Sequence, residues 1–127
     1  MAKTNPKALA GRQKRQFQFL PIPVLNEIAE GMAEGARKYG AYNWREKPIE
    51  ASDYYDSTMR HLTAWMSGED VDPDSGVHHL SKAITGLVVV RDAVLNGSFI
   101  DDRPKQKNQS PDVVVPNILT KGGLQCQ

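Results

Sequence analysis

The sequence contains very little cysteine: Cys126 is the only one among its 127 residues. One cysteine cannot form an intrachain disulfide, and it excludes a zinc site built from cysteines. A long apolar run is also missing, because the stretch GLVVV at residues 86–90 is far too short to span a bilayer. The first residues lack the apolar segment of a secretory signal peptide. We therefore expect a cytoplasmic protein that has no membrane partner.

A large excess of charge of one sign is absent as well, since the formal net charge is +1. The charges are nevertheless unevenly spread. Residues 27–74 hold eleven acids and five bases, a local balance of −6, whereas the first sixteen residues hold five bases and no acid. A basic arm can contact nucleic acid. Arms this short are more often flexible tails, so we do not expect nucleic acid as a partner.

The segment that follows Pro21 has the apolar spacing of a helix, and Gly40 is a stop signal for it. Gly31 and Gly35 interrupt this segment and lower its helix propensity, so we expect a packing reason for them. The apolar positions that recur at helical spacing are Leu25, Ile28, Ala29, Met32 and Ala36.

Two more helices are expected. The first covers residues 53–66 with Ser52 as a good N-cap, and the second covers about residues 76–95 with Asp74 or Ser75 as its cap. The fold class that we expect is all-α, a small helical bundle. One apolar stripe runs along the helix at 53–66, and its members are Tyr55, Met59, Leu62 and Met66.

The chain has the length of one compact domain, and with 39% hydrophobic residues it can bury only a small core. We expect partner subunits to share in that burial. The expected organisation is a basic, flexible arm at 1–19, a helical catalytic domain at 20–99 and a polar tail at 100–127. Within the tail, DVVVP at 112–116 predicts a short strand or an arm that docks on a neighbour.

Carboxylates line one face of each of the first two helices. Glu27, Glu30 and Glu34 fall within an arc of about 60° at 3.6 residues per turn, and Asp53 and Asp56 share a face with Arg60. Aligned carboxylates repel one another. A hard divalent cation, which prefers oxygen ligands, would offset that repulsion. A solvated acidic face explains the same pattern, so both interpretations stay open.

The stretch WMSGEDVDPDSGVHHL gathers four carboxylates and two histidines around one turn. One carboxylate suffices to cap the helix that follows, so three remain without that explanation. His79 is either a buried, hydrogen-bonded side chain or a ligand or general base, and His61 on the preceding helix raises the same choice. The loop carboxylates are Glu69, Asp70, Asp72 and Asp74.

The stretch ARKYGAYNWR offers what a nucleotide needs. Lys38 can pair with phosphate, Trp44 or Tyr42 can stack on a base, and Asn43 can contact a base edge. The alternative is a helix end whose aromatic side chains cover the core.

Three motifs together resemble a known family. In chain order they read GARKYGAYNW, RHLTAW and GEDVDPDSGVHHL. They are similar to motifs of the small phage dATP/dGTP diphosphohydrolases, which are relatives of the MazG-type all-α nucleoside triphosphate pyrophosphohydrolases. The resemblance covers roughly residues 20–92. It implies a MazG-like bundle completed as a homodimer or homotetramer, located in the host cytoplasm if the chain is phage-encoded. Some phage relatives convert dGTP to dGMP for the synthesis of 2-aminoadenine nucleotides.

The resemblance also implies a site for Mg²⁺ or Mn²⁺, with two or more ions. The family's first carboxylate element is matched by Glu27 and Glu30, extended to Glu34, and its second by Asp53 and Asp56, with Asp in place of Glu. A rival set of ligands lies in the family's loop motif. Its members are Glu69, Asp72, Asp74 and His79.

The implied reaction is the hydrolysis of purine deoxynucleoside triphosphates, dGTP favoured and dATP accepted, to the monophosphate and pyrophosphate. Glu30 or Glu34 would take the proton of the attacking water. The expected substrate-binding residues are Lys38, Asn43, Trp44, Arg60 and His61. Two alternatives stay open: a phosphohydrolase that binds metal through its histidines and releases tripolyphosphate, and a non-enzymatic helical module that binds nucleic acid.

Overall fold

The computed structural model describes residues 4–105 of the chain, which divides into one unit of residues 1–20 and 105–127 and another of residues 21–104. The expected strand or arm at 112–116 and Cys126 lie outside the described residues. In chain order the elements are α1 (Pro6–Gly11), the 3-10 helix η1 (Phe17–Phe19), α2 (Ile22–Tyr39), α3 (Asn43–Glu46), β1 (Ile49–Glu50), α4 (Ala51–Met66), α5 (His79–Asn96) and β2 (Phe99–Ile100).

The first unit contains a short helix that the sequence analysis did not anticipate. Pro6 is the first residue of α1, where its missing N–H costs no hydrogen bond. The Asn5 side chain accepts hydrogen bonds from the backbone N–H groups of Lys7 and Ala8 and so caps the helix. Every described residue of this arm is exposed, so α1 depends on its local cap and not on packing.

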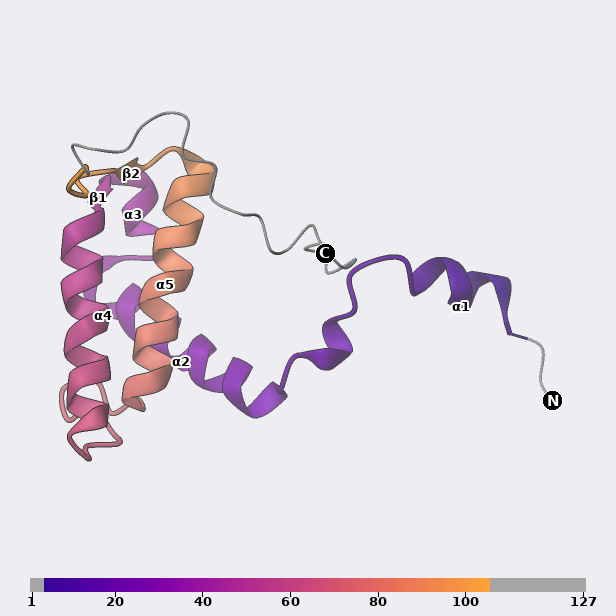
Figure 1. Cartoon of the computed structure of the whole chain (residues 1–127), viewed down its shortest axis with the longest axis horizontal. Coiled ribbons are helices and arrows are strands. Elements are labelled where there is room, and N and C mark those ends of the chain that lie inside the picture. The colour runs from indigo at the N-terminus through magenta and orange to yellow at the C-terminus, as the bar shows by residue number, and fades with distance from the viewer. Residues whose placement is uncertain (1–3, 106–127) are drawn as a thin grey trace. The chain divides into compact units, whose positions relative to one another are not determined.

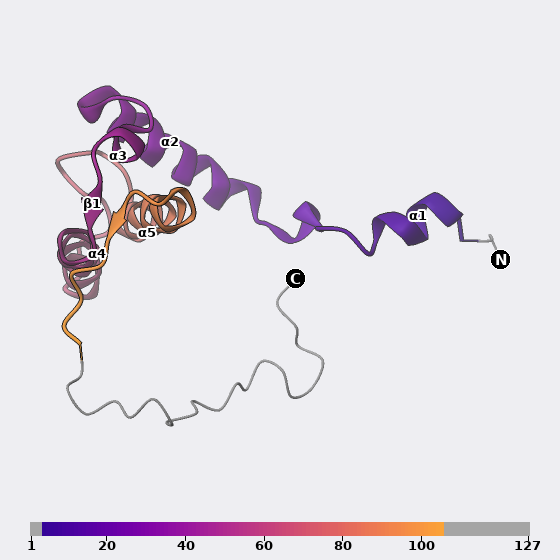
Figure 2. The ribbon, with the colours of Figure 1, turned by 90° about the horizontal axis from the view of Figure 1, so that it is seen from above.

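The second unit confirms the expected all-α class. Helices α4 and α5 run side by side, and α2 crosses them (Figures 1 and 2). α2 begins after Pro21 and ends at Gly40, whose φ of +93° suits glycine, as expected from the sequence. Gly31 lies against α5: an added Cβ would meet the Thr85 hydroxyl oxygen at 2.5 Å. The packing reason expected for Gly31 is therefore confirmed, whereas Gly35 has nothing within 4 Å of an added Cβ.

The caps expected for the other two helices were wrong. Glu50 precedes α4, and Ser52 lies inside its first turn, where its backbone N–H and its hydroxyl both donate to the Asp102 carboxylate. Helix α5 begins at His79 and not near residue 76. The His78 ring, through Nδ1, accepts the backbone N–H of Leu80 at 3.1 Å and caps this helix. Local sequence did not identify the cap of α4 because Asp102 lies fifty residues from the helix start that it stabilises.

A short parallel pair of strands, also not anticipated, joins the segment before α4 to the segment after α5. β1 precedes α4, β2 follows α5, and Ile49 pairs with Phe99. The small core lies beside this pair and consists of Trp44, Val89 and Ala93 with partly buried neighbours. No helix within residues 4–105 is long and apolar enough to cross a membrane.

Candidate active site

A cavity of about 670 Å³ opens between α2, α4, α5 and the loop that precedes α5. This volume falls within the range of about 300–1,000 Å³ that is usual for small-molecule sites. Its charged lining residues come from separate parts of the chain. They are Glu34, Lys38, Asp53, Arg60, Asp72, Asp74 and Lys82.

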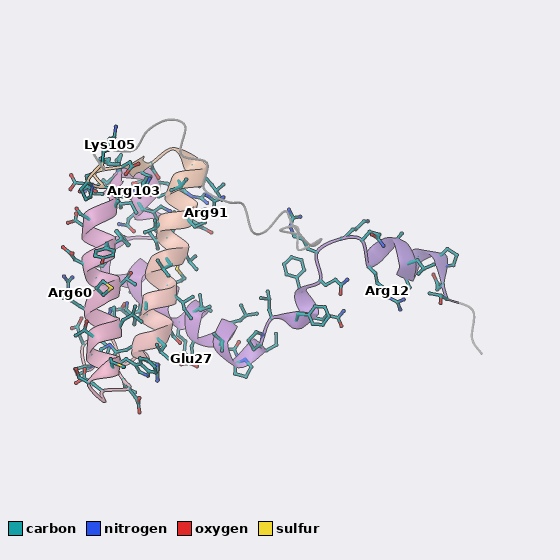
Figure 3. All side chains as sticks on the ribbon, viewed as in Figure 1. Arg12, Glu27, Arg60, Arg91, Arg103 and Lys105 are labelled. Atoms are coloured by element: carbon teal, nitrogen blue, oxygen red, sulfur yellow. The ribbon has the colours of Figure 1, made fainter. Side chains whose placement is uncertain are left out.

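Helix α4 turns one face to the cavity. Asp53, Ser57, Arg60 and Ala64 all line it, at the spacing i, i+4, i+7, i+11 that places residues on one side of a helix. Arg60 lies halfway along the helix (Figure 3). Asp56, expected on the same face as Asp53 and Arg60, does not line this cavity. It lines a second, more open depression on α4, which Arg60 also lines.

Glu34 is buried between two lysines. Nζ of Lys38 lies 2.7 Å from its Oε1, and Nζ of Lys82 donates a hydrogen bond to its Oε2 at 2.9 Å. The hydrogen bonds from Lys38 and then Lys82 outweigh the effect of burial and lower the pKa of Glu34. Lys38 also donates to Asp74 at 2.9 Å, and these partners raise the pKa of Lys38. Lys82 was not among the residues expected from the sequence, although a lysine in the largely apolar first half of α5 was a usable signal.

In the acidic loop, the carboxylates of Asp72 and Asp74 have different roles. Asp72 accepts hydrogen bonds from the Ser75 hydroxyl at 2.7 Å and from the backbone N–H groups of Asp74 and Ser75, and so shapes the turn. Burial raises its pKa, but these hydrogen bonds outweigh burial and the pKa is lowered. Asp74 binds Lys38. The loop therefore supplies charges to the cavity and builds the turn that carries them.

His79 is buried, with 3% of its surface exposed, and both of its ring nitrogens are engaged. Its Nε2 lies 2.7 Å from Oε1 of Glu69, and its Nδ1 lies 2.9 Å from Nδ1 of His61. In this arrangement neither nitrogen of His79 is available to a metal ion. The neighbouring His78 lies 3.9 Å from Asp70.

Trp44 is 7% exposed and forms part of the cavity wall and of the core. Its indole N–H donates to Asp92 at 2.7 Å, and Arg45 binds the same carboxylate through two hydrogen bonds. The hydrogen bonds from Arg45 and Trp44 lower the pKa of Asp92 to about 2. Asn43 lines the cavity beside Trp44, whereas Tyr42 does not and instead lies under the Arg45 guanidinium at 4.4 Å.

The cavity brings together most of the expected site residues but not all of them. Glu27 bonds to the Ser81 hydroxyl at 3.3 Å near the start of α5 (Figure 3), Glu30 is exposed, and neither lines the cavity. Asp56 and Glu69 also lie outside it. The expected residues that line it are Glu34, Lys38, Asn43, Trp44, Asp53, Arg60, His61, Asp72, Asp74 and His79.

The donors of the cavity suit a hard cation. Among residues 4–105, no three His, Asp or Glu side chains are grouped closely enough to hold a metal ion by themselves. Mg²⁺ needs no such cage, because it usually binds through one or two carboxylates, water and the phosphates of its substrate. Glu34 and Asp53 line the same cavity from facing helices and fit that requirement.

Comparison with known proteins gives two matches. Residues 4–103 match the family model described as "dATP/dGTP diphosphohydrolase, N-terminal". The chain is also 34% identical over 110 residues to a dATP/dGTP diphosphohydrolase of Salmonella phage PMBT28. The aligned part is 87% of this chain but only 35% of that relative, so the chain spans about a third of the relative's length. No solved structure matches the chain significantly.

Proposed function

The chain belongs to the family of dATP/dGTP diphosphohydrolase N-terminal domains, and from that premise we propose that it hydrolyses purine deoxynucleoside triphosphates to the monophosphate and pyrophosphate. The observation that supports this reaction is the cavity, which sets carboxylates beside lysine and arginine side chains in a space large enough for a nucleotide. Our preference for dGTP over dATP rests on the resemblance to phage relatives.

The charge of the cavity supports metal dependence. Four carboxylates and three cationic side chains line it, a balance of −1 with the histidines neutral. A triphosphate is a polyanion and is not attracted to such a lining by itself. Mg²⁺ or Mn²⁺ supplies the missing positive charge and lowers the pKa of bound water. Glu34 and Asp53 are the residues that we assign to hold the ions.

We assign three side chains to the phosphates. Arg60 offers a planar fork that matches a phosphate. Lys38 and Lys82 each carry an ammonium group that is paired with Glu34 in the free protein. If Glu34 held a metal ion, both ammonium groups would be available to phosphate oxygens.

We assign the base to the aromatic side chains of the lining. Tyr39, Trp44 and Tyr54 line the cavity, and aromatic rings stack on bases. The Asn43 amide beside them can donate to and accept from a base edge.

We assign a second copy of the chain as the partner. The stripe of Tyr55, Met59, Leu62 and Met66 faces away from the cavity and is exposed, from 36% at Leu62 to 81% at Met66. On α5, Leu87 and Leu95 are also exposed. Apolar surface of this extent marks an interface more often than a free surface, and a homodimer or homotetramer would cover it.

The test is a product assay. The purified protein is incubated separately with dGTP, dATP, dCTP and dTTP in Mg²⁺, Mn²⁺ or EDTA, and the products are resolved by anion exchange. We expect monophosphate and pyrophosphate from the purine nucleotides only, and no product in EDTA. Release of tripolyphosphate would identify the histidine-metal alternative. No turnover, together with salt-dependent DNA binding, would identify the nucleic-acid module.

A further inference from the structure

A chain of hydrogen bonds in the cavity wall has no role in the reaction as described so far. It begins at Glu69 in the loop between α4 and α5, passes through the buried ring of His79 and ends at His61 on α4. The two contacts are short, 2.7 Å from Glu69 to His79 and 2.9 Å from His79 to His61. Hydrogen bonds therefore connect three side chains from three segments in series.

The chemistry of the donors fixes the positions of the protons. A carboxylate only accepts, so Nε2 of His79 must carry a hydrogen that it donates to Glu69. A neutral imidazole has one N–H, so Nδ1 of His79 is an acceptor and Nδ1 of His61 donates to it. The remaining nitrogen of His61, Nε2, is then left with its lone pair.

That lone pair belongs to a residue of the cavity wall. His61 and His79 line the cavity, whereas Glu69 does not and is half exposed on the outside. Within residues 4–105, the ring of His61 forms no hydrogen bond other than the one to His79. The charged groups that act on His61 are Asp72, Lys82 and Arg60. Burial lowers its pKa more than Asp72 raises it, which favours the neutral ring.

The carboxylate expected from the sequence is poorly suited to accept a proton. Glu34 is held by Lys38 and Lys82, and these ammonium groups stabilise its ionised form. Protonation of Glu34 would weaken both of these ion pairs, and its oxygens are also needed to hold a metal ion. Glu34 is therefore a weak base. In the part of the chain that the structure describes, Nε2 of His61 has no such competing partner.

We propose that Glu69 and His79 are positioning residues that present the Nε2 lone pair of His61 to the cavity, where it takes the proton of the water that attacks the α-phosphorus. This role rests on the pyrophosphohydrolase function proposed above. It also accounts for the paired histidines and for Glu69, which lies outside the cavity.

The step balances as follows in atoms and charge. The water oxygen forms a bond to the α-phosphorus, and the bond from that phosphorus to the bridging oxygen breaks. The electron pair leaves with pyrophosphate, and the water proton moves to Nε2 of His61. The Nδ1 proton of His61 can pass to His79 at the same time, so the positive charge comes to rest beside the Glu69 carboxylate, which stabilises it.

The protons can be located without any turnover. Long-range ¹H–¹⁵N NMR of protein labelled with ¹⁵N-histidine, at a pH where the rings are neutral, distinguishes protonated from unprotonated ring nitrogens. We expect hydrogen on Nδ1 of His61 and on Nε2 of His79. E69A should abolish this pattern, whereas E69Q should preserve it because the amide oxygen still accepts. D70N alters the adjacent exposed carboxylate and should leave the pattern unchanged. Hydrogen on Nε2 of His61 in the unaltered protein would overturn the proposal.

The kinetic arm uses variants that separate the two nitrogens of His61. In H61N the amide can still donate to His79 but nothing replaces Nε2. We expect kcat to fall by about 100-fold or more, the contribution usual for a general base, with KM changed by less than about threefold. E69A should lower kcat by roughly 10- to 100-fold, E69Q should recover most of it, and D70N should match the unaltered protein. A kcat near that of the unaltered protein in H61N would rule out the proton role.

The two proposals fail in different ways. If the unaltered protein hydrolyses no nucleotide, the proposed function is wrong and with it the proton transfer. The NMR pattern still decides whether Glu69 and His79 fix the tautomer of His61. If turnover is found and the NMR pattern is as expected but H61N retains its rate, then His61 does not accept the proton of the attacking water, while the proposed function stands.

Discussion

At the scale of single residues, Glu34 and Glu30 show what sequence periodicity cannot distinguish. The two lie four residues apart, which separates them by about 40° around a helix, and the sequence offered both as the catalytic carboxylate. Glu34 is buried in the cavity and Glu30 is exposed outside it. The difference depends on where α5 packs against α2. That contact is tertiary, so the order of residues along α2 could not reveal it.

Asp92 gives a prediction for pH dependence. Its pKa is lowered from 3.8 to about 2 by Arg45 first and Trp44 second. A lowered pKa means that the ionised form stabilises the folded protein. This contribution is fully present above the unfolded value and is lost as the pH falls toward the folded value. D92N should therefore be less stable than the unaltered protein at neutral pH, and the gap should close between about pH 4 and about pH 2.

Urea unfolding of both proteins at several pH values measures this gap. The comparison cancels the titration of the other carboxylates, because both proteins contain them. A difference in unfolding free energy that stays constant across this pH range would contradict the role assigned to the Asp92 carboxylate.

At the scale of elements, the three long helices and the start of α2 were predictable, whereas the caps of α4 and α5 were not. Apolar spacing located α2, α4 and α5, since burial on one side imposes that period. The cap of α4 was missed because its partner is distant in sequence: Asp102 reaches Ser52 across the β1–β2 pair. The cap of α5 was missed although it is local, because a histidine ring takes the place of the usual Asp or Ser. The strand pair was also missed, because two residues in each strand are too few to show a period.

The crossing of α2 and α5 yields a prediction with a matched control. G31A should destabilise the protein by about 1–3 kcal/mol, the usual cost of overpacking, because the new Cβ meets the buried Thr85. G35A, on the same helix with open space around it, should instead stabilise the protein by up to about 1 kcal/mol through helix propensity.

Thermal and urea unfolding of the two variants measure these effects. The double variant G31A/T85A should recover part of the loss, because it removes the side chain in contact. A neutral G31A would show that α2 and α5 approach less closely than the structure indicates.

At the scale of the whole molecule, the sequence predicted the apolar stripe of α4 but not whether the chain's own core or a partner would bury it. Helical spacing predicted the stripe, and one chain does not bury it, since Met59 and Leu62 are 41% and 36% exposed. The sequence contains no signal for which of two apolar faces meets the chain's own core and which meets a partner. The homo-oligomer expected from the small core stays a prediction.

M59E tests that prediction. A carboxylate placed in an apolar interface is costly, so self-association should weaken by roughly 100-fold, while M59L should associate like the unaltered protein. Sedimentation equilibrium measures the association constants. If all three proteins are monomers, the proposed interface does not form.

The central claim is that the cavity between α2, α4 and α5 is the place where a purine deoxynucleoside triphosphate is cleaved. Pyrophosphate release from dGTP with Mg²⁺ or Mn²⁺, compared between the unaltered protein, E34Q and E30Q, tests it most directly. We expect E34Q to lose about 100-fold or more of kcat/KM, as when an electrostatic group is removed from an active site. E30Q, altered on the same helix but outside the cavity, should stay close to the unaltered protein. Full activity in a folded E34Q, or loss of activity in E30Q alone, would contradict the claim and place the reaction elsewhere.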